Sequence, residues 1–126
     1  MEIQHTAIAV TDLERTKEFY EDGLGLEYAW DFHNDAGVHN YYVTGEELDT
    51  WLQFVHDPDD ESPVEPGGIV HLALEVDDLD AVFDDIVNAT GCEVLDGPIT
   101  IDAADARAAF IKDPDGYEIE IFQRLD

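Results

Sequence analysis

An internal repeat constrains the fold of this chain more than any other feature of its sequence. Residues 5–14 read HTAIAVTDLE and residues 71–80 read HLALEVDDLD, with His, Ala, Val, Asp and Leu at matching positions. Self-similarity of this kind indicates that one supersecondary unit is present twice. We therefore expect two modules, at about 1–57 and about 69–126, joined by a proline-rich linker at about 58–68.

Both modules show the same order of secondary-structure signals. Each opens with the alternation of a half-buried strand, and an aspartate then stands where a helix would begin, Asp12 or Asp78. The helices are expected to end at Gly23 and Gly91, the second being the better marked. Three extended segments follow each helix, at about 26–33, 38–44 and 50–56 in the first module and at about 92–95, 106–112 and 117–123 in the second. The pattern predicts an α+β fold with a βαβββ module repeated twice.

Length and cysteine content limit the architecture and the chemistry. The chain has 126 residues, enough for one ordinary domain, so both modules are expected to form a single domain over 1–126. Cys92 is the only cysteine, which excludes an internal disulfide and a CxxC redox pair. A lone thiol and the lack of a signal-like or membrane-spanning segment favour a cytoplasmic protein.

The charge of the chain excludes whole classes of partner. There are 5 Lys and Arg against 32 Asp and Glu, a formal net charge of −27. Such a field repels phosphate backbones and anionic lipids, so we expect no nucleic acid and no membrane as partners. Because molar salt would screen the self-repulsion, the acidic composition favours a halophilic source.

Four polar residues lie on the sheet face that the helices should leave open. If the apolar positions of the strands face the helices, alternation turns His5 and Gln53 of module one, and His71 and Glu120 of module two, the other way. Two imidazoles, an amide oxygen and a carboxylate suit Zn²⁺, Ni²⁺, Co²⁺, Mn²⁺ or Fe²⁺. Each residue alone could simply be solvated, but their common register in both copies favours a metal site.

The remaining polar and aromatic candidates carry weaker signals. Trp51 and Phe122 flank the proposed ligands, either as core aromatics or as walls of a substrate cavity. Arg107 could hold a substrate carboxylate in the cavity or form a surface ion pair. Three histidines without a register in the repeat are interpreted as surface residues: His33, His39 and His56.

The sequence resembles the vicinal oxygen chelate superfamily, which includes glyoxalase I, methylmalonyl-CoA epimerase, extradiol dioxygenases, and fosfomycin and bleomycin resistance proteins. The resemblance rests on HTAIAVTDLERTKEFYEDGLGLE, GGIVHLALEVDDLDAVF and AAFIKDPDGYEIEIF, and covers essentially the whole chain. It implies tandem βαβββ modules whose eight strands form a curved mixed sheet, a cup with helices on its outer face. The family's metal ligands fall on four residues of this chain: His5, Gln53, His71 and Glu120.

Within the superfamily, the sequence is most similar to small bacterial glyoxalase I. That resemblance implies a homodimer and a lyase/isomerase acting on the hemithioacetal of methylglyoxal and a thiol, through an enediolate chelated by one divalent metal (Zn, Ni, Co or Mn). Glu120 would be the base that moves the proton. Three alternatives stay open: a methylmalonyl-CoA epimerase, an extradiol-type dioxygenase using Fe(II), and a non-catalytic protein that sequesters a ligand.

Several positions depart from the patterns of these families. Gln53 stands where bacterial glyoxalases usually have Glu, and Ala9 and Asp57 stand where they have an arginine and an asparagine for glutathione. The acidic chain is therefore a poor host for glutathione. Gln53 resembles some epimerases, but Asn40, which matches their second acid/base, cannot titrate.

Overall fold

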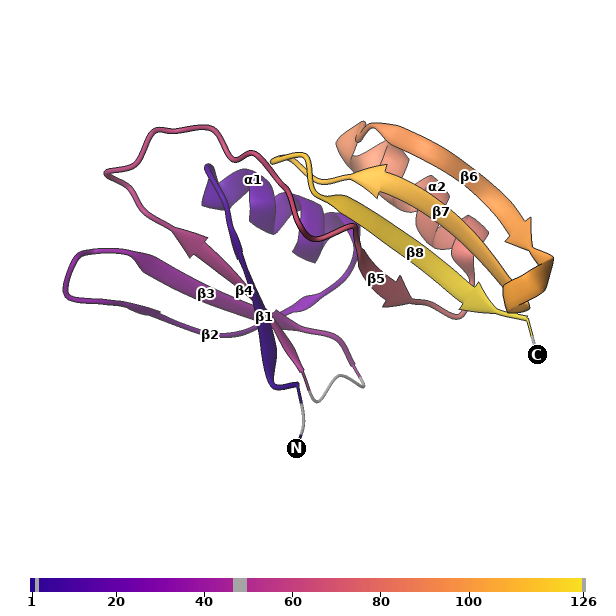
Figure 1. Ribbon diagram of the computed structural model, residues 1–126, viewed down its shortest axis with the longest axis horizontal. Helices are drawn as coiled ribbons and strands as arrows, with labels where there is room; N and C mark the ends of the chain where they lie inside the picture. The colour runs from indigo at the N-terminus through magenta and orange to yellow at the C-terminus, as the bar shows by residue number, and fades with distance from the viewer. Residues whose placement is uncertain (2, 47–49, 126) are drawn as a thin grey trace. The chain divides into compact units, whose positions relative to one another are not determined.

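The computed structural model describes residue 1, residues 3–46 and residues 50–125 (Figure 1). The chain divides into two compact units, Met1–Val64 and Glu65–Asp126. The boundary falls inside the proline-rich segment predicted as the linker, and each unit contains one copy of the repeat. That both units form one domain stays a prediction.

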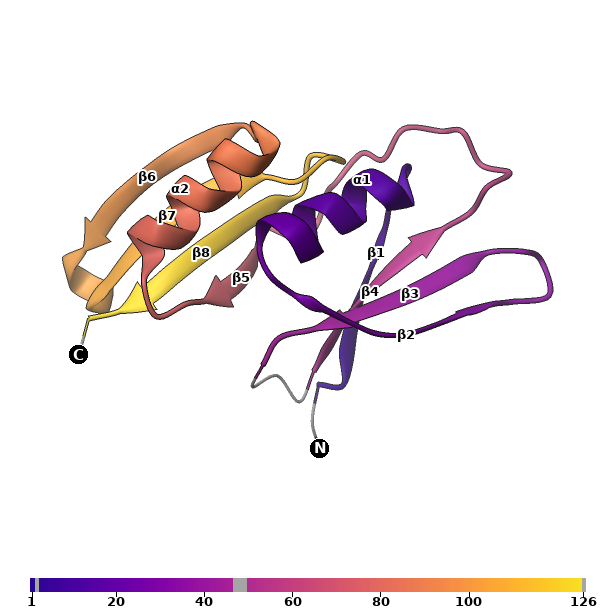
Figure 2. The same ribbon diagram turned by 180° about the vertical axis from the view of Figure 1, so that it is seen from behind.

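Unit 1 contains one helical segment and a four-stranded mixed sheet. Its elements are β1 (His5–Ala9), α1 (Leu13–Lys17), the π-helical η1 (Glu18–Gly23), β2 (Glu27–His33), β3 (His39–Thr44) and β4 (Trp51–His56). The strand order is β1-β4-β3-β2, with β1 parallel to β4 and the other pairs antiparallel. The helix lies along one face of this sheet (Figure 2).

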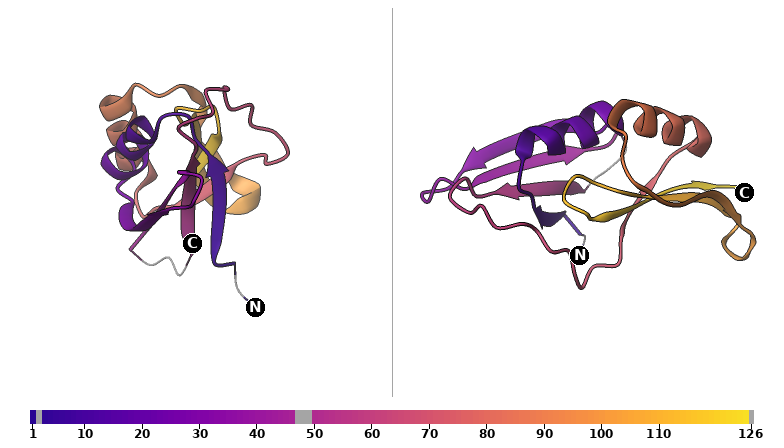
Figure 3. Two further views of the ribbon diagram at one scale, coloured as in Figure 1. Left: turned by 90° about the vertical axis from the view of Figure 1, so that its left-hand side faces the viewer. Right: turned by 90° about the horizontal axis from the view of Figure 1, so that it is seen from above.

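Unit 2 repeats the same topology. Its elements are β5 (Leu72–Glu75), α2 (Leu79–Thr90), β6 (Val94–Ile101), the 3-10 turn η2 (Asp102–Ala104), β7 (Ala106–Lys112) and β8 (Glu118–Arg124). The order is β5-β8-β7-β6, again with one parallel pair, β5 and β8. Helix α2 covers one face of the sheet (Figure 3). The predicted α+β fold of two βαβββ modules is confirmed.

The helix boundaries follow from local chemistry that the sequence already showed. The Asp12 carboxylate accepts a hydrogen bond from the Arg15 backbone N–H at 3.1 Å, and Asp78 does the same for Ala81 at 3.2 Å. Each carboxylate satisfies an N–H group that the first turn leaves without a helical partner. Gly91 ends α2 with φ of 63°, a left-handed conformation that glycine adopts without steric cost.

In each unit the core lies between the helix and the sheet. The side chains that unit 1 buries there include Ile8, Val10, Phe19, Tyr20, Val43 and Phe54. Unit 2 buries Leu79, Ile86, Ile111, Ile119 and Ile121. Ile8, Phe54, Ile119 and Ile121 are among the strand positions whose alternation predicted the helix-facing side, so the opposite side of each sheet is the open face, as expected.

One strand differs from the prediction. The expected segment 92–95 ends before Asp96, Gly97 and Pro98, whereas β6 continues through them to Ile101. Two register irregularities against β7 accommodate these residues, and β6 is an edge strand, which tolerates a proline because one of its sides has no ladder partner. The predicted segment, about 92–95, was therefore too short and began two residues early.

The tight turn between β7 and β8 is organised by Asp113. The Asp113 carboxylate accepts hydrogen bonds from the backbone N–H groups of Asp115 and Tyr117, both at 2.9 Å. Gly116 has φ of 92°, which a residue with a side chain rarely adopts. This turn fixes the pairing of β7 with β8, and with it the position of Glu120. Among the described residues, no helix combines the length and the apolar character needed to span a membrane.

Candidate functional site

On the open face of unit 2, His71 and Glu120 lie against each other. Nε2 of His71 is 3.2 Å from Oε1 of Glu120, and the two side chains are 35% and 18% exposed. Glu120 pairs in register with Phe110 of β7, and the ring of His71 meets that of Phe110 edge-on, with centroids 5.9 Å apart. The aromatic ring thus supports both polar groups from the neighbouring strand.

The open face of unit 1 has an equivalent arrangement around Tyr42. Gln53 pairs in register with Tyr42, and the His5 ring meets the Tyr42 ring edge-on at 5.8 Å. Nδ1 of His5 is 2.9 Å from Oε1 of Gln4. In the tautomer that donates from Nδ1 to this amide oxygen, Nε2 presents its lone pair.

Gln53 is the most constrained of the four predicted ligands. It is 8% exposed, and its Nε2 donates a hydrogen bond to Oδ1 of Asn40 at 2.8 Å. Asn40 in turn donates from Nδ2 to the backbone carbonyl of Val38 at 3.2 Å. Since the amide nitrogen of Gln53 is used in this way, its carbonyl oxygen is the atom suited to bind a cation. Asn40 therefore orients Gln53.

Trp51 belongs to a group of aromatic side chains on the same open face of unit 1. Its register partner on β1 is His5, and its ring meets that of Tyr42 at 5.5 Å. The Trp30 ring stacks on Tyr42 with centroids 4.5 Å apart and planes inclined by only 8°, and Phe32 stacks on Trp30 at 5.3 Å. Trp30 is nevertheless 40% exposed. We call these four residues the aromatic stack: Trp30, Phe32, Tyr42 and Trp51.

A cavity of about 410 Å³ lies on the open face of unit 2. It is lined by Ile101, Ala104, Asp105, Ala106, Glu120, Phe122 and Arg124. Glu120, Phe122 and Arg124 alternate along β8, so they share one face of the strand. The structure therefore places Phe122 beside Glu120 in a cavity wall and adds Arg124, which the sequence reasoning did not name. The alternation that located Glu120 could have identified Arg124.

Arg107 lies on the opposite, helix-covered face of the sheet. Its register partner on β8 is Gln123, one residue out of phase with Phe122. Its Nε and Nη2 atoms donate to the two carboxylate oxygens of Asp80 on α2, at 2.7 and 2.8 Å. This bidentate contact lowers the pKa of Asp80. Of the two interpretations of Arg107, the ion pair is the one observed, and the structure does not bring Arg107 together with Glu120.

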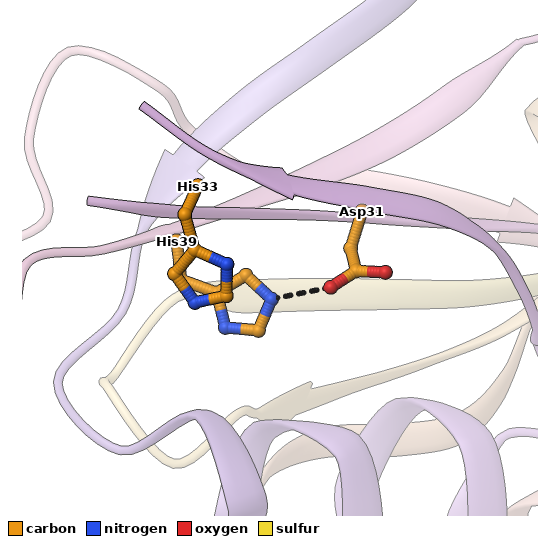
Figure 4. Close-up of side chains that lie close together, drawn as sticks. All are labelled: Asp31, His33 and His39. Atoms are coloured by element: carbon orange, nitrogen blue, oxygen red, sulfur yellow. Dashed lines mark hydrogen bonds and ion pairs between the residues drawn. The ribbon is translucent and has the colours of Figure 1, made fainter. Parts of the chain in front are cut away.

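Three side chains of types that can bind a metal ion lie close together at the end of the β2–β3 hairpin. Asp31, His33 and His39 each offer one ligand atom, and these atoms lie within 4.8 Å of one another (Figure 4). Nε2 of His39 is 2.7 Å from Oδ2 of Asp31, and the two imidazole rings stack at 4.0 Å. The Tyr28 hydroxyl, which donates to Asp31, and the His39 ring together lower the pKa of Asp31. The sequence reasoning treated His33 and His39 as separate surface residues.

The family assignment comes from comparison with known proteins. The model of the glyoxalase/bleomycin resistance protein/dioxygenase superfamily matches residues 2–121. The chain belongs to this superfamily. A lactoylglutathione lyase from Neisseria meningitidis is 30% identical over 128 aligned positions, covering 98% of this chain and 91% of the relative.

Solved structures with a similar fold are also known. TnmS3, an antibiotic binding protein from Streptomyces sp. CB03234, is 30% identical and has a TM-score of 0.79. The match covers 98% of this chain and 96% of the TnmS3 chain. A glyoxalase I mutant from Zea mays has a TM-score of 0.86 at 23% identity, covering 99% of this chain and 45% of the maize chain. The second likeness concerns the fold alone. The similar structures thus include both a glyoxalase I and a protein named for antibiotic binding.

The four predicted ligands have the donor chemistry that a divalent metal ion prefers. His71 and Glu120 are separated by 3.2 Å, which is close to the spacing of about 3 Å between adjacent ligand atoms around a small divalent ion. His5 presents Nε2, and Gln53 presents its carbonyl oxygen. Imidazole with oxygen donors suits Zn, Ni, Co, Mn and Fe. Each unit therefore supplies one nitrogen and one oxygen donor of suitable type.

Proposed function

We propose that this protein is a metal-dependent lyase/isomerase of the glyoxalase I type, acting on the hemithioacetal formed by methylglyoxal and a thiol. One observation carries the proposal: both units present a histidine beside an aromatic residue whose register partner is an oxygen donor. The triplets are His5, Tyr42 and Gln53 in unit 1 and His71, Phe110 and Glu120 in unit 2. The relatives named lactoylglutathione lyase support the same activity.

Four residues would hold the metal ion, namely His5, Gln53, His71 and Glu120. A divalent cation bound there would stabilise negative charge on two adjacent substrate oxygens and so make the C1–H bond more acidic. Because Gln53 is neutral, the ligand set carries a single formal negative charge, which leaves more of the cation's field for the substrate. We also propose a homodimer, which sedimentation in molar KCl would test.

Glu120 is the residue that moves the proton. Its carboxylate takes the proton from C1 of the hemithioacetal, and a proton is returned to C2, so a hydroxyl and a carbonyl exchange places and no atom is gained or lost. Glu120 is suited to this because it borders the cavity and is the one carboxylate among the four proposed ligands. Gln53, at the equivalent place in unit 1, is an amide and cannot act as a base. Glu120 is therefore the base among the four proposed ligands.

The residues that line the cavity limit the size and charge of the thiol that could bind there. Phe122 supplies an apolar wall and Arg124 a cation, which the side chain of Glu75 approaches with its Oε1 3.3 Å from Nε. Ala9 and Asp57 replace the cationic and amide groups expected for glutathione. We therefore propose a smaller thiol with one carboxylate at most, which Arg124 would bind.

The experiment that tests this function is an isomerase assay on protein loaded in turn with Zn²⁺, Ni²⁺, Co²⁺ and Mn²⁺. Methylglyoxal is mixed with each of several thiols, glutathione included, and thioester formation is followed with and without oxygen. We expect turnover that does not need oxygen and that places solvent deuterium at C2. Turnover that stops without oxygen would instead assign the dioxygenase alternative. If all metal and thiol combinations fail, the isomerase proposal is wrong.

The structure gives the epimerase alternative no support. Epimerisation needs a second acid/base on the other face of the substrate, and the matching residue is Asn40. Asn40 already donates to Val38 and accepts from Gln53. An amide held in this way orients a neighbour and cannot carry a proton between states.

A second candidate function is ligand sequestration without catalysis, and the aromatic stack favours it. Trp30 and Phe32 are 40% and 39% exposed although they stack on their neighbours, so a planar apolar ligand could add to the stack. The likeness to an antibiotic binding protein points the same way. Quenching of tryptophan fluorescence by planar compounds, equal in metal-free and metal-loaded protein and lost in Trp30→Ala, would support this candidate. If no quenching is observed, ligand sequestration is rejected and the isomerase proposal stays.

A further inference from the structure

We propose that Asp31, His33 and His39 form a second binding site for a transition-metal ion such as Zn²⁺, on the helix-covered side of the unit 1 sheet. The site is separate from His5 and Gln53, the two predicted ligands of unit 1. Those residues lie beside Tyr42, and alternation along β3 puts His39 and Tyr42 on opposite faces of the sheet. The three residues belong to one hairpin, so the site needs nothing from the rest of the chain.

The positions of the ligand atoms support metal binding. Around a tetrahedral Zn²⁺ with bonds of about 2.0–2.1 Å, neighbouring ligand atoms lie about 3.3 Å apart. The three atoms here already lie within 4.8 Å of one another, so side-chain rotations alone could complete the set (Figure 4). The cation would replace the proton that Nε2 of His39 donates to Oδ2 of Asp31 at 2.7 Å. Two imidazoles and one carboxylate leave a position for water.

The backbone holds the two histidines opposite each other. His33 and His39 are register partners at the closing end of the β2–β3 ladder. The loop between them is fixed by Asn34, whose Oδ1 accepts from the backbone N–H groups of Ala36 and Val38 at 2.9 and 3.1 Å. A rigid turn reduces the conformational entropy lost when the metal binds.

A residue outside the ligand set orients the carboxylate. The Tyr28 hydroxyl donates to Oδ1 of Asp31 and leaves Oδ2 directed toward His39. Partners of this kind fix the direction of a ligand, and their removal typically weakens metal binding about 10- to 100-fold. Tyr28 is therefore a positioning residue of the proposed site.

The test is a Zn²⁺ titration of the whole metal-free protein in molar KCl with excess Mg²⁺, followed by calorimetry and by the NMR signals of the histidine rings. We expect two Zn²⁺ per chain, one of which shifts the signals of His33 and His39. His33→Gln and His39→Gln should each weaken that ion at least tenfold while the other ion stays bound. Asp31→Asn should do the same, and Tyr28→Phe should weaken it less.

Matched variants separate a built site from adventitious binding to an acidic surface. Asp35→Asn removes the same charge from the neighbouring loop, and His56→Gln removes the next histidine in the same cross-strand row, the register partner of His39 on β4. Both should bind Zn²⁺ like the parent chain, and circular dichroism should show that all variants fold. The proposal is wrong if Mg²⁺ displaces the second ion, if His33→Gln and Asp31→Asn both keep it, or if the control variants lose it equally. Because His5→Ala and His71→Ala remove only the other ion, failure here is distinct from failure of the proposed function.

Discussion

His71 and Glu120 make the contact that links the fold of this protein to its proposed chemistry. Nε2 of His71 is 3.2 Å from Oε1 of Glu120, although 48 residues separate them in the chain. The contact exists because β5 pairs in parallel with β8, so that Ala73 lies opposite Glu120 and the chain just before β5 reaches the carboxylate. One nitrogen and one oxygen donor thus meet on the open face of unit 2.

The first prediction concerns Glu120. Glu120→Gln keeps an oxygen donor but removes the base, so the metal content should change little while turnover falls about 10²- to 10⁴-fold. Elemental analysis and the isomerase assay on the same preparation measure both quantities. The control is Glu118→Gln, which removes the same charge two residues earlier on β8 and should stay active. A fully active Glu120→Gln protein would refute the assignment of the base.

The second prediction separates the two arginines of unit 2. Arg124→Gln removes the cation that lines the cavity, so KM for a thiol substrate carrying a carboxylate should rise roughly tenfold with kcat nearly unchanged. Arg107→Gln removes the partner of Asp80 on the other face, so it should lower Tm and leave KM unaltered. Steady-state kinetics and thermal melts on both variants check this. The reverse pattern would mean that Arg107, as the sequence allowed, contacts the substrate.

The third prediction concerns pH and the pair formed by Asp80 and Arg107. The pKa of Asp80 is lowered in the folded chain, chiefly by its hydrogen bonds from Arg107. A carboxylate with a depressed pKa adds stability that is fully present above its unfolded pKa of about 3.9 and is lost as the pH falls through the folded value. The Tm advantage of the parent chain over Asp80→Asn should therefore be constant from pH 7 to 5 and shrink below about pH 4. Asp84→Asn, which makes the same charge change on α2 and leaves the pair of Asp80 and Arg107 intact, is the matched control.

The fourth prediction follows from the charge of the whole chain. With a net charge of −27, repulsion among carboxylates opposes the folded state, and 1 M KCl reduces the screening length to about 3 Å. Tm should rise steadily between dilute buffer and molar KCl, by a similar amount in KCl and NaCl. Equal melting temperatures in dilute and molar salt would contradict both the repulsion and the halophilic interpretation.

The fold was predictable because its signals are local and occur twice. Asp12 and Asp78 cap their helices, and Gly91 ends α2, each through contacts within a few residues. Alternation then determined which strand residues face the helix. The exception was β6, where Gly97 and Pro98 are accommodated by bulges at a sheet edge, and no local pattern shows that a strand will lie at an edge.

The site was predictable only in part, because register decides which side chains meet. Alternation placed Glu120 and Phe122 on one face, and the same rule extended by two residues would have included Arg124. Arg107 lies one residue out of phase with that set, which the sequence could not show without the pairing of β7 with β8. The cluster of Asp31, His33 and His39 was not predicted, because His33 and His39 are brought together by the register of β2 and β3.

The most direct measurement is the metal content of the chain carrying His33→Gln and His39→Gln, purified in molar KCl without a metal-affinity tag. In that variant the site of Asp31, His33 and His39 has lost both histidines. Elemental mass spectrometry then reports on the other four proposed ligands: His5, Gln53, His71 and Glu120. We predict about one Zn, Ni, Co or Mn per chain, lost in His5→Ala and in His71→Ala but retained in His56→Ala. Iron as the bound metal would favour the dioxygenase alternative. No bound metal even after reloading, or metal retained without His5 and His71, would contradict the account.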